Sequence, residues 1–534
     1  ATDGFILRTT DQNQNSSSHN YVAWNWDMGA DTPTGFGCVT YKGDGTSGRE
    51  IGGVGFQPDV VWIKNRDTAR NHSITDSVRG AGIRLLPNGT HSEYSDQYAA
   101  DSFEPDGFKV DNGDDINKSG DDIVAWCWDM GGTTASNTSG TISSQVRANP
   151  TYGQSIVSWT GNGTVGHGLS SSPDMFIVKP RNATGAWWTW HKDLSNTSQG
   201  YLQLNTTAAE ATNSSVWDNA SPVTSSTINA NTAYINYATD DYIAYCFHSV
   251  SGYSKFGTYT GDATTNHSKS VTLGFRPAFL MVKKTSGTGN WVMVDNVRNP
   301  MSNDVDKYVK ADTTDVEATQ SGELFKFTST GFTIGANLGD VNANGATYIY
   351  MAFAGGMDSI SDYNTDGSSD SRVKANTTYG QSIVTYTGQS GAQTIGHGLD
   401  SAPEMIIAKN RSSAQEWLVY HHSITDAEQK YLRLDTTGTV ADNTFWNDTA
   451  PTSSVFSVGD SQPINSGHGN DYVAYCFHSV TGYSSIGSWT GNGSATGASV
   501  TTGFKPAFIL WKNTNFENHW GILDSTRSPT NPRD

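Results

Sequence analysis

The sequence is poor in the residues that build helices and bind nucleic acid. Only ten of its 52 acidic residues are Glu, and 33 Lys and Arg leave a net charge of −19. Because Asp favours turns and Glu favours helices, this acid usage indicates loops and strands. The chain shows no basic stripe of the kind that binds nucleic acid and no apolar run long enough to span a membrane. We therefore expect neither a nucleic-acid partner nor membrane insertion.

Cysteine is also scarce, with four residues at Cys38, Cys127, Cys246 and Cys476. The last three occupy the same place in one repeated motif, so we expect them in equivalent positions of separate domains, too far apart for a disulfide. The sequence thus predicts buried free thiols that act as small hydrophobic side chains. No Cys-x-x-Cys pair is present, and no zinc or redox site is indicated.

The common catalytic motifs are missing as well. The chain has no GxGxxG before a helix, no P-loop, no HExxH and no GxSxG. A sandwich-fold glycosidase needs two neighbouring carboxylates, which a chain with so few Glu residues supports weakly. The acid-rich loops 111–115 and 364–370 could hold calcium through oxygen ligands, but solvated turns fit them better. We predict that the protein is not an enzyme, has no cofactor and has no metal site.

The sequence does contain a strong internal repeat. "DDYIAYCFHSVSGYS" (240–254) returns as "NDYVAYCFHSVTGYS" (470–484), with twelve of fifteen residues identical. The motif alternates between two largely apolar faces, as expected for a strand in the middle of a covered sheet. A Cys-His metal or catalytic pair is the alternative. It supplies only two ligands, however, and Asp129 stands where His248 would follow Cys127. We therefore interpret the motif as a core strand.

A second motif opens on Pro and ends on Lys six residues later, and it predicts a strand buried on both faces. It occurs as "PDVVWIK" (58–64), "PDMFIVK" (173–179), "PAFLMVK" (277–283), "PEMIIAK" (403–409) and "PAFILWK" (506–512).

Two repeat types alternate around these motifs. The first type carries Asp-x-x-Arg, which we interpret as a structural ion pair, at Asp76 and Arg79, Asp295 and Arg298, and Asp524 and Arg527. The second type carries "TYGQSIV" and "GHGL", with Tyr152, His167 and His191 matched by Tyr379, His397 and His421.

The repeats predict an all-β protein, a tandem array of jelly-roll-like β-sandwich domains of about 105 residues that forms an extended rod. The two ends match only half a first-type domain, so the chain is either a piece of a longer one or has halves that complement each other head to tail. The predicted divisions are a closing half (1–30), first type (31–132), linker (133–146), second type (147–250), first type (251–356), linker (357–371), second type (372–480) and an opening half (481–534).

The aromatic segment "GAWWTWHKD" (185–193) is the best candidate for a binding face. Trp188 and Trp190 fall on one face of a predicted strand, with Tyr420 at the matching place in the other second-type domain. If exposed, they could stack on sugar rings. Other residues are predicted as structural core markers: Cys127, Cys246, Cys476, Trp187, Trp291, Trp417 and Trp520.

The motifs "GFQPDVVWIKNR", "VAWCWDMGG", "YGQSIVSWTGNG", "GFRPAFLMVKK" and "ATYIYMAFA" resemble the repeated lectin-like sandwich domains of virion proteins from phages of marine bacteria and cyanobacteria, such as tail fibres. The resemblance covers nearly the whole chain. It implies a concanavalin/laminin-G-like jelly roll without established catalysis, located in the virion or outside the cell. One departure is that "YMAFA" is commonly followed by a chain-terminal segment, whereas here another pair of domains begins.

Three functions follow as hypotheses. The first is a non-enzymatic structural and adhesion protein of a phage virion, a tail fibre or capsid appendage. Its partners would be copies of itself, other virion proteins and host cell-surface glycans. The alternative is a self-assembling extracellular filament or surface array joined head to tail by its half-domains. A polysaccharide-degrading enzyme on the same scaffold is the least favoured.

Overall fold

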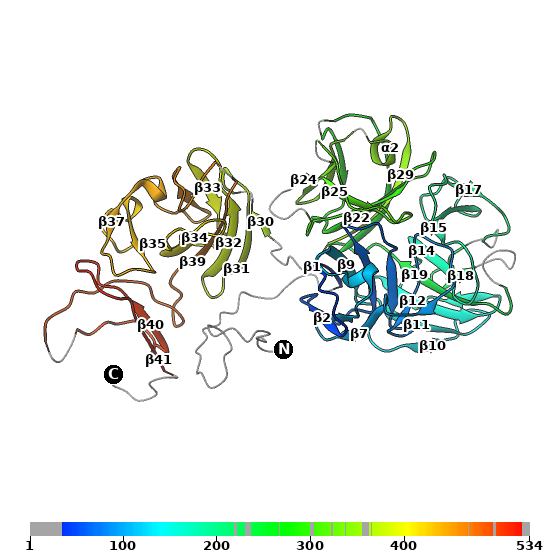
Figure 1. The fold of residues 1–534 in the computed structure, drawn as a ribbon, viewed down its shortest axis with the longest axis horizontal. Helices are drawn as coiled ribbons and strands as arrows, with labels where there is room; N and C mark the ends of the chain where they lie inside the picture. Colours follow the sequence, from blue (N-terminus) through cyan, green and yellow to red (C-terminus); the bar gives the residue numbers. More distant parts are fainter. Residues whose placement is uncertain are drawn as a thin grey trace. The chain divides into compact units, whose positions relative to one another are not determined.

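The computed structural model is built almost entirely of β-strands, which confirms the all-β prediction (Figure 1). Two units divide the chain, one of residues 31–358 and one built on residues 359–534. The structure describes residues 35–217, 222–229, 237–265, 267–298, 304–321, 324–336, 338–354, 362–364, 366–467, 469–494 and 498–525.

Module 1 (35–132) is a sandwich of a four-stranded and a three-stranded antiparallel sheet. Val39, Val61, Ala125 and Phe108 fill the space between the sheets. Two short elements, β5 (Ile83–Arg84) and β6 (Tyr94–Ser95), pair outside the sandwich, and α1 (Asp114–Asn117) is a single turn. The sheets run β1 (Phe36–Lys42), β9 (Asp122–Trp128), β3 (Val60–Asn65), β4 (Ser73–Asp76), and β2 (Arg49–Gly52), β8 (Gly107–Val110), β7 (Ala100–Glu104).

Module 2 (133–250) has a longer main sheet of eight strands and a two-stranded partner. Its first two strands lie largely in the segment 133–146, so the prediction of a linker there is wrong. Those Ser- and Thr-rich residues pair as an edge hairpin of the sheet. The strands are β10 (Ala135–Asn137), β11 (Ser144–Asn149), β12 (Gln154–Thr160), β19 (Asp241–Phe247), β14 (Met175–Pro180), β15 (Trp188–His191), β16 (Gly200–Gln203), β17 (Ala211–Thr212), and β13 (Thr164–Gly166) with β18 (Thr227–Asn229).

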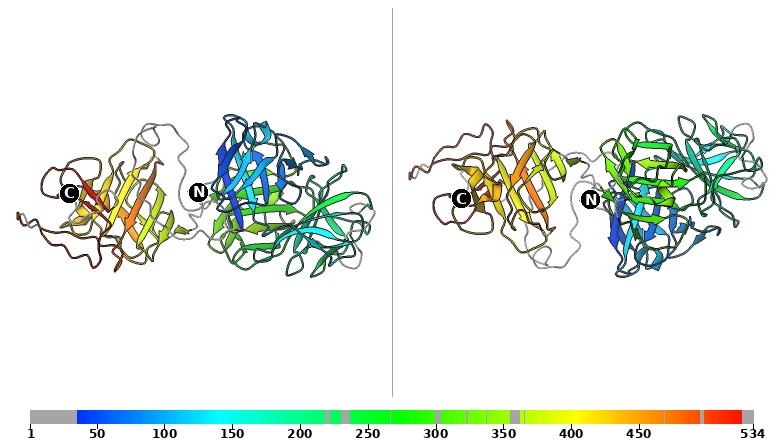
Figure 2. Two further views of the ribbon diagram at one scale, coloured as in Figure 1. Left: turned by 90° about the horizontal axis from the view of Figure 1, so that it is seen from below. Right: turned by 90° about the horizontal axis from the view of Figure 1, so that it is seen from above.

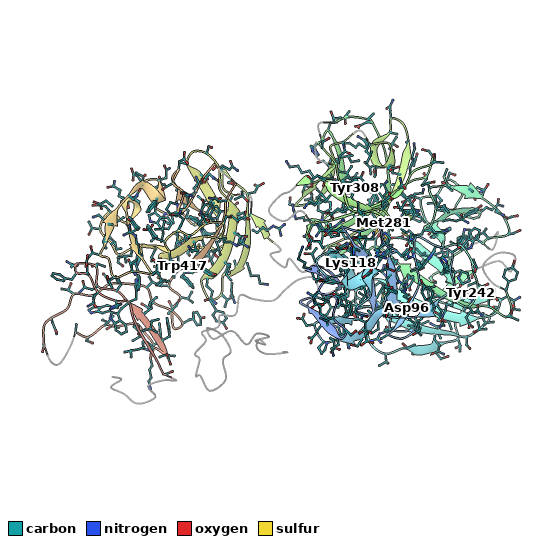
Figure 3. All side chains as sticks on the ribbon, in the orientation of Figure 1. Asp96, Lys118, Tyr242, Met281, Tyr308 and Trp417 are labelled. Carbon is teal, nitrogen blue, oxygen red and sulfur yellow. The ribbon has the colours of Figure 1, made fainter. Side chains whose placement is uncertain are left out.

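Module 3 (251–354) is a sandwich of a six-stranded and a four-stranded sheet, and its Met281 is buried in the core that it shares with modules 1 and 2 (Figure 3). The six-stranded sheet runs β20 (Ser254–Thr260), β29 (Thr347–Phe353), β22 (Phe279–Lys284), β23 (Trp291–Asp295), β25 (Lys307–Lys310), β26 (Ala318–Thr319). The other runs β21 (Lys269–Thr272), β28 (Gly331–Ile334), β27 (Phe325–Thr328), β24 (Asp304–Val305), and α2 (Gly339–Asn342) is one turn.

Module 4 (362–480) repeats the strand order of module 2, and its edge strands lie in and next to the predicted linker 357–371, which corrects that prediction too. The last described element is a hairpin of β40 (Phe508–Trp511) and β41 (Gly521–Asp524). Module 4 consists of β30 (Asp362–Asn364), β31 (Ser371–Asn376), β32 (Gln381–Thr387), β39 (Asp471–Phe477), β34 (Met405–Asn410), β35 (Leu418–His421), β36 (Lys430–Arg433), β37 (Ala441–Asp442), β33 (Gln393–Gly396), β38 (Val455–Val458) and the 3-10 turns η1 (Ala427–Gln429) and η2 (Thr444–Trp446).

The repeated sequence motifs are the central strands of these sheets. We call β9, β19, β29 and β39 the closing strands and β3, β14, β22, β34 and β40 the motif strands. Each closing strand lies between two neighbours, one of which is the motif strand of its module. Cys127, Cys246 and Cys476 are fully buried and free, as a core strand requires.

Modules 1, 2 and 3 pack on one another around a shared aromatic core (Figure 2). The ring centroid of Phe36 lies 5.2 Å from Trp128 in its own module and 5.5 Å from Phe279 of module 3. Phe247 of module 2 reaches Phe353 of module 3 at 5.8 Å. Within this unit the modules are therefore not separate beads on a rod.

Candidate functional site

A backbone contact between modules occurs three times in the first unit. In each, the N–H of a Glu from one module donates to the carbonyl of the residue two places after the motif Lys of another. The contacts run from module 1 to 2, from 2 to 3 and from 3 back to 1, so the three modules close a ring. They are Glu93 to Arg181 (2.7 Å), Glu210 to Thr285 (3.0 Å) and Glu317 to Arg66 (2.8 Å).

Side chains strengthen two of these joints. The guanidinium of Arg181 binds both carboxylate oxygens of Glu93, each at 2.9 Å. Arg66 binds Glu317 in the same forked way, at 2.9 and 2.8 Å. Two parallel charge-assisted bonds fix orientation as well as distance, so they hold the modules in register. Thr285 stands at the third joint, which has no such pair.

The Asp-x-x-Arg corners prove to be inter-module contacts as well as ion pairs. Asp76 and Arg79 form a fully buried pair at 2.5 Å, and the Tyr245 hydroxyl of module 2 donates to Asp76 at 2.7 Å. Asp295 and Arg298 pair at 2.7 Å, and the Trp126 indole N–H of module 1 donates to Asp295 at 3.0 Å. A buried ion pair is tolerated only when its carboxylate oxygens are hydrogen-bonded. Backbone N–H groups of the same module donate to Oδ1 of each Asp, and the neighbouring module adds its donor to Oδ2, beside the Arg.

The third joint lacks both the carboxylate and the donor that the other two joints have. The strand register places His191 of module 2 where Asp76 and Asp295 stand, and Met351 of module 3 where Trp126 and Tyr245 stand. A module without the carboxylate thus meets a neighbour without the donor. The sequence predicted the ion pairs at residues 76–79 and 295–298 correctly, but it missed their partners. Arg527 of the third pair lies outside the described residues.

The predicted glycan-binding face is wrong, because Trp188, Trp190 and Tyr420 are only 9, 4 and 4 % exposed. Trp190 stacks on Phe176 with centroids 5.4 Å apart, and its indole donates to the Thr197 carbonyl at 2.8 Å. Both faces of β15 are covered, so no ring of this segment is open to a sugar.

The Trp residues predicted as core markers bridge modules. Trp187 and Trp291 are fully buried, and their indoles donate to the carbonyls of Leu86 (2.8 Å) and Gln203 (3.1 Å) in neighbouring modules. Trp417 is only half-buried. Trp520, also half-buried, donates to the Arg433 carbonyl at 2.8 Å, so the hairpin meets module 4 as module 3 meets module 2.

The second unit leaves one sheet face of module 4 partly open. Ile177, Tyr245 and Phe247 are at most 5 % exposed in module 2, where modules 1 and 3 cover them. The same residue types at 407, 475 and 477 of module 4 are half-exposed. The sequence cannot distinguish the two faces, because the covering comes from other modules.

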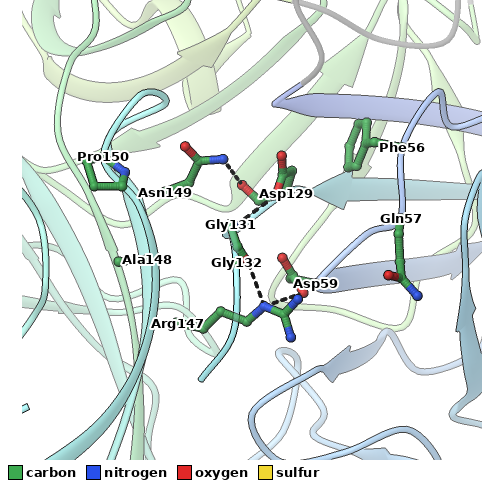
Figure 4. Close-up of a pocket in the computed structure, with 10 residues that line it drawn as sticks. All are labelled: Phe56, Gln57, Asp59, Asp129, Gly131, Gly132, Arg147, Ala148, Asn149 and Pro150. Atoms are coloured by element: carbon green, nitrogen blue, oxygen red, sulfur yellow. Dashed lines mark hydrogen bonds and ion pairs between the residues drawn. The ribbon is translucent and has the colours of Figure 1, made fainter. Parts of the chain in front are cut away.

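An open cleft of about 490 Å³ lies between modules 1 and 2 (Figure 4). Among its lining residues Phe56 is half-exposed and Gln57 is exposed, and the Gln57 amide donates to the Phe103 carbonyl at 2.8 Å. The remaining lining residues are Asp59, Asp129, Gly131, Gly132, Arg147, Ala148, Asn149 and Pro150.

Asp59 is the most perturbed group of this cleft. Burial raises the pKa of its carboxyl to about 6, although the Arg147 guanidinium opposes the shift. Arg147 contacts one carboxylate oxygen at 2.7 Å, and the Met130 N–H donates to the other at 2.8 Å. With both oxygens occupied, Asp59 fixes the cleft wall. Asp174 stands at the same motif position in module 2 and likewise accepts a backbone N–H, that of Ser249, at 2.8 Å. The contact is therefore a structural feature that recurs in the repeat.

No group of three or more His, Cys, Asp or Glu side chains among the described residues could hold a metal ion. In the acid-rich loop 111–115, Asp114 and Asp115 bind Arg70 (2.6 Å) and Arg84 (2.8 Å). None of the helices in the described parts of the chain has the length and apolarity needed to cross a membrane.

The chain belongs to the family described as a domain of unknown function, DUF7483, which it matches over residues 32–356 and again over residues 358–534. The first match coincides with the three-module ring, so the family's unit and the structural unit agree. No curated protein and no solved structure matches the chain.

Proposed function

We propose that this member of the DUF7483 family is a non-enzymatic structural and adhesion protein of a phage virion, part of a tail fibre or capsid appendage. It would work outside the cell, beside copies of itself and other virion proteins. The resemblance of its repeats to virion sandwich domains supports this role, and so does the use of its charged residues.

The proposal rests on the buried ionisable side chains, which are used in contacts between modules. Asp76, Arg79, Asp295 and Arg298 are fully enclosed, and each carboxylate is completed by a donor from another module. Groups arranged in this way hold domains together and are inaccessible to a substrate. A stiff multi-domain unit is what a virion appendage needs in order to present a surface at a distance.

The cleft between modules 1 and 2 is the proposed contact for host glycans. A sugar ring offers an apolar face and a rim of hydroxyls, which aromatic rings and amide groups recognise together. Phe56 and Pro150 supply apolar surface, and Gln57 and Asn149 supply amides. The open shape suits an internal segment of a polysaccharide.

A glycan array and binding to purified surface polysaccharide would test this role, with a variant that blocks the cleft. A Cβ atom added at Gly132 meets nothing within 4 Å and Gly132 lines the cleft, so we expect Gly132→Trp to obstruct the cleft. Gly487→Trp is the matched control, because Gly487 also has open space around it but lies in the second unit.

We expect wild type and Gly487→Trp to bind the same glycans and Gly132→Trp to lose at least about tenfold in affinity, roughly 1.4 kcal/mol. Equal binding by all three would place the contact elsewhere, and binding by none would remove the adhesion part of the proposal. Release of reducing sugar that disappears in Asp59→Asn would favour a degrading enzyme instead.

A further inference from the structure

The three joints of the first unit share one side-chain hydrogen bond, and at one joint its donor is a His. In each joint the side chain eight residues after the motif Lys donates to a carbonyl of the neighbouring module. Trp187 and Trp291 are the donors to modules 1 and 2, at 2.8 and 3.1 Å. At the joint between modules 3 and 1 the same place is His72, whose Nε2 lies 3.0 Å from the Lys310 carbonyl. Of these three donors, His72 is the one that can change its charge.

A second exchange of residue types accompanies this His. Trp62 of β3 stands where modules 2 and 3 have Ile177 and Met281, and its indole N–H donates to Nδ1 of His72 at 2.9 Å. A carbonyl only accepts a hydrogen bond and an indole N–H only donates one, so the imidazole is neutral with its proton on Nε2. Both of its nitrogens are occupied, and a second proton on Nδ1 would point at the Trp62 donor.

The surroundings of His72 oppose a positive charge. The side chain is fully buried, and burial together with the cations Lys64 and Arg298 lowers the pKa of His72 well below its ordinary value of 6.5. The carbonyls of Lys310 and Thr313 act in the opposite direction but do not outweigh these effects. Protonation inside the closed joint therefore buries a charge and breaks the contact with Trp62.

The other charged side chains on the neighbouring elements are engaged in ion pairs of their own. These are Arg298 with Asp295 and Glu317, and Lys310 with Asp315. The Lys64 ammonium binds backbone carbonyls, including that of Thr314 in module 3 at 3.3 Å.

The joint between modules 3 and 1 is also the one that no consecutive stretch of chain connects. Modules 1 and 2 follow each other, as do modules 2 and 3, whereas His72 and Lys310 are 238 residues apart. The aromatic rings of Phe36 and Phe279 meet across this joint at 5.5 Å. Contacts alone therefore hold it closed, and it can open while each module stays folded.

We propose that His72 is an acid-sensitive latch, a side chain that keeps modules 3 and 1 joined while it is neutral and releases them when it is protonated. Release would expose the apolar faces that carry Phe36 and Phe279. The joint between modules 1 and 2 has Trp187 at this place and would stay closed. The inference stands independently of the proposed function, because it concerns contacts within the first unit alone.

The direction and size of the effect follow from linkage. A solvated His titrates near pH 6.5 and His72 of the closed joint titrates lower, so its contribution is complete above that pH and is lost as the pH falls. Each pH unit below 6.5 shifts the equilibrium about tenfold toward the open joint, until the pKa of the closed joint is reached. Between pH 7.5 and 4.5 the open fraction should rise by up to about 100-fold.

Two thiols of module 1 report on the joint and on the module separately. Cys38 lies two residues after Phe36 on the same face of β1, within the shared aromatic core, and Arg298 of module 3 interacts with it electrostatically. Cys127 packs between the two sheets of module 1. Opening of the joint thus exposes Cys38 alone, whereas unfolding of module 1 exposes both.

The experiment measures how fast each thiol of the full chain reacts with a dipyridyl disulfide, a reagent that also works in acid. Peptide mapping separates the two thiols. The rate in denaturant divided by the rate in buffer at the same pH gives a protection factor, which removes the effect of pH on the reagent.

The matched variant is Trp62→Ile with His72→Trp, which gives module 1 the two residue types that module 2 has at these places. The new indole can donate to the Lys310 carbonyl and does not titrate. His72→Gln is a second, smaller change, because its amide N–H can donate to the same carbonyl and is also uncharged in acid. Comparing variants is necessary because the carboxylates of the joint also titrate in acid.

Between pH 7.5 and 4.5 we expect the protection factor of wild-type Cys38 to fall about 10- to 100-fold, with that of Cys127 changing less than about threefold. A Cys38 protection factor that stays within about threefold in either folded variant supports the latch. An equal fall in wild type and both variants would assign the acid response to another group and overturn the proposal. It would also be overturned if Cys38 and Cys127 lost protection together, or if wild-type Cys38 stayed protected at pH 4.5.

Discussion

The hydroxyl of Tyr245 donates a 2.7 Å hydrogen bond to the carboxylate of Asp76 across the boundary between modules 2 and 1. Both groups are buried, and burial raises the pKa of the Tyr245 hydroxyl well above its usual range. The Asp76 carboxylate already binds Arg79, so the tyrosine completes a three-part network that joins two domains. The closed arrangement of modules 1, 2 and 3 is therefore held together by polar groups as well as by its aromatic core.

Tyr245→Phe should lower the free energy of unfolding of the first unit by about 1.5–3 kcal/mol, because it removes a hydrogen bond to a buried charge. The matched control is Tyr475→Phe, at the same place in module 4. That residue is half-exposed, so we expect a change within about 0.5 kcal/mol. Urea unfolding with separate probes for the two units measures both values. Equal losses would show that the Asp76 contact adds nothing.

The pair of Arg66 and Glu317 should contribute more than an exposed pair. Both side chains are 12 % exposed, and their bonds connect modules 1 and 3. A double-mutant cycle to Gln or Ala is expected to give a coupling energy of about 1–3 kcal/mol. Lys42 and Asp122, 66 and 45 % exposed, are the control and should give less than about 1 kcal/mol. Similar coupling energies would argue that burial of the first pair brings no gain.

His167 should make the protein sensitive to acid. Its Nδ1 accepts the Leu169 N–H at 3.1 Å and its Nε2 faces the Thr224 carbonyl at 3.3 Å, so the neutral ring fits and a second proton has no acceptor. Burial lowers the pKa to about 4. Because the unfolded ring titrates near 6.5, the contribution is complete above that pH and is lost as pH falls toward 4, at most about 3 kcal/mol.

Thermal unfolding at pH 7.5, 5.5 and 4.5 checks this sign. The difference between wild type and His167→Asn should shrink as the pH falls. The comparison must be between variants, because the raised pKa of Asp59 stabilises the fold in the opposite direction between about pH 4 and 6. A difference for His167→Asn that grows in acid would refute the assignment.

The four thiols should not react with a thiol reagent in the native protein. All are buried, and burial raises the pKa of Cys246 and Cys476 to about 12. An aromatic disulfide reagent at pH 8 should label none in buffer and all four in denaturant, with no change on prior reduction. Rapid labelling of Cys127, Cys246 or Cys476 in buffer would contradict the core positions given to the closing strands.

The local structure could be predicted from the sequence, because its signals are local. The expected strand 58–64 is β3 (Val60–Asn65), and the motif containing Cys246 is β19. In module 4 the alternation of buried Tyr472, Ala474 and Cys476 with half-exposed neighbours follows the period-two reading.

The packing of modules on one another could not be predicted, because it depends on which apolar faces meet. The same alternating motif forms β19 of module 2, which is buried on both faces, and β39 of module 4, which is half-exposed on one face. Trp188 is an example of a prediction that failed for this reason. Its pattern fits an exposed binding strand as well as a covered one, and only the packing against Tyr201, with ring centroids 5.0 Å apart, decides between them. One signal was available: Trp126 and Tyr245 place polar atoms on an otherwise apolar strand face, which requires a partner.

Modules 1, 2 and 3 should unfold as one cooperative unit. Hydrogen exchange followed by mass spectrometry tests it directly, because it gives an opening free energy for each segment. Segments covering β3, β14 and β22 should open with the same free energy, and Tyr245→Phe should lower all three equally while leaving β34 of module 4 unchanged. Three different opening free energies, or a loss confined to β14, would show that the modules unfold independently and would contradict the account.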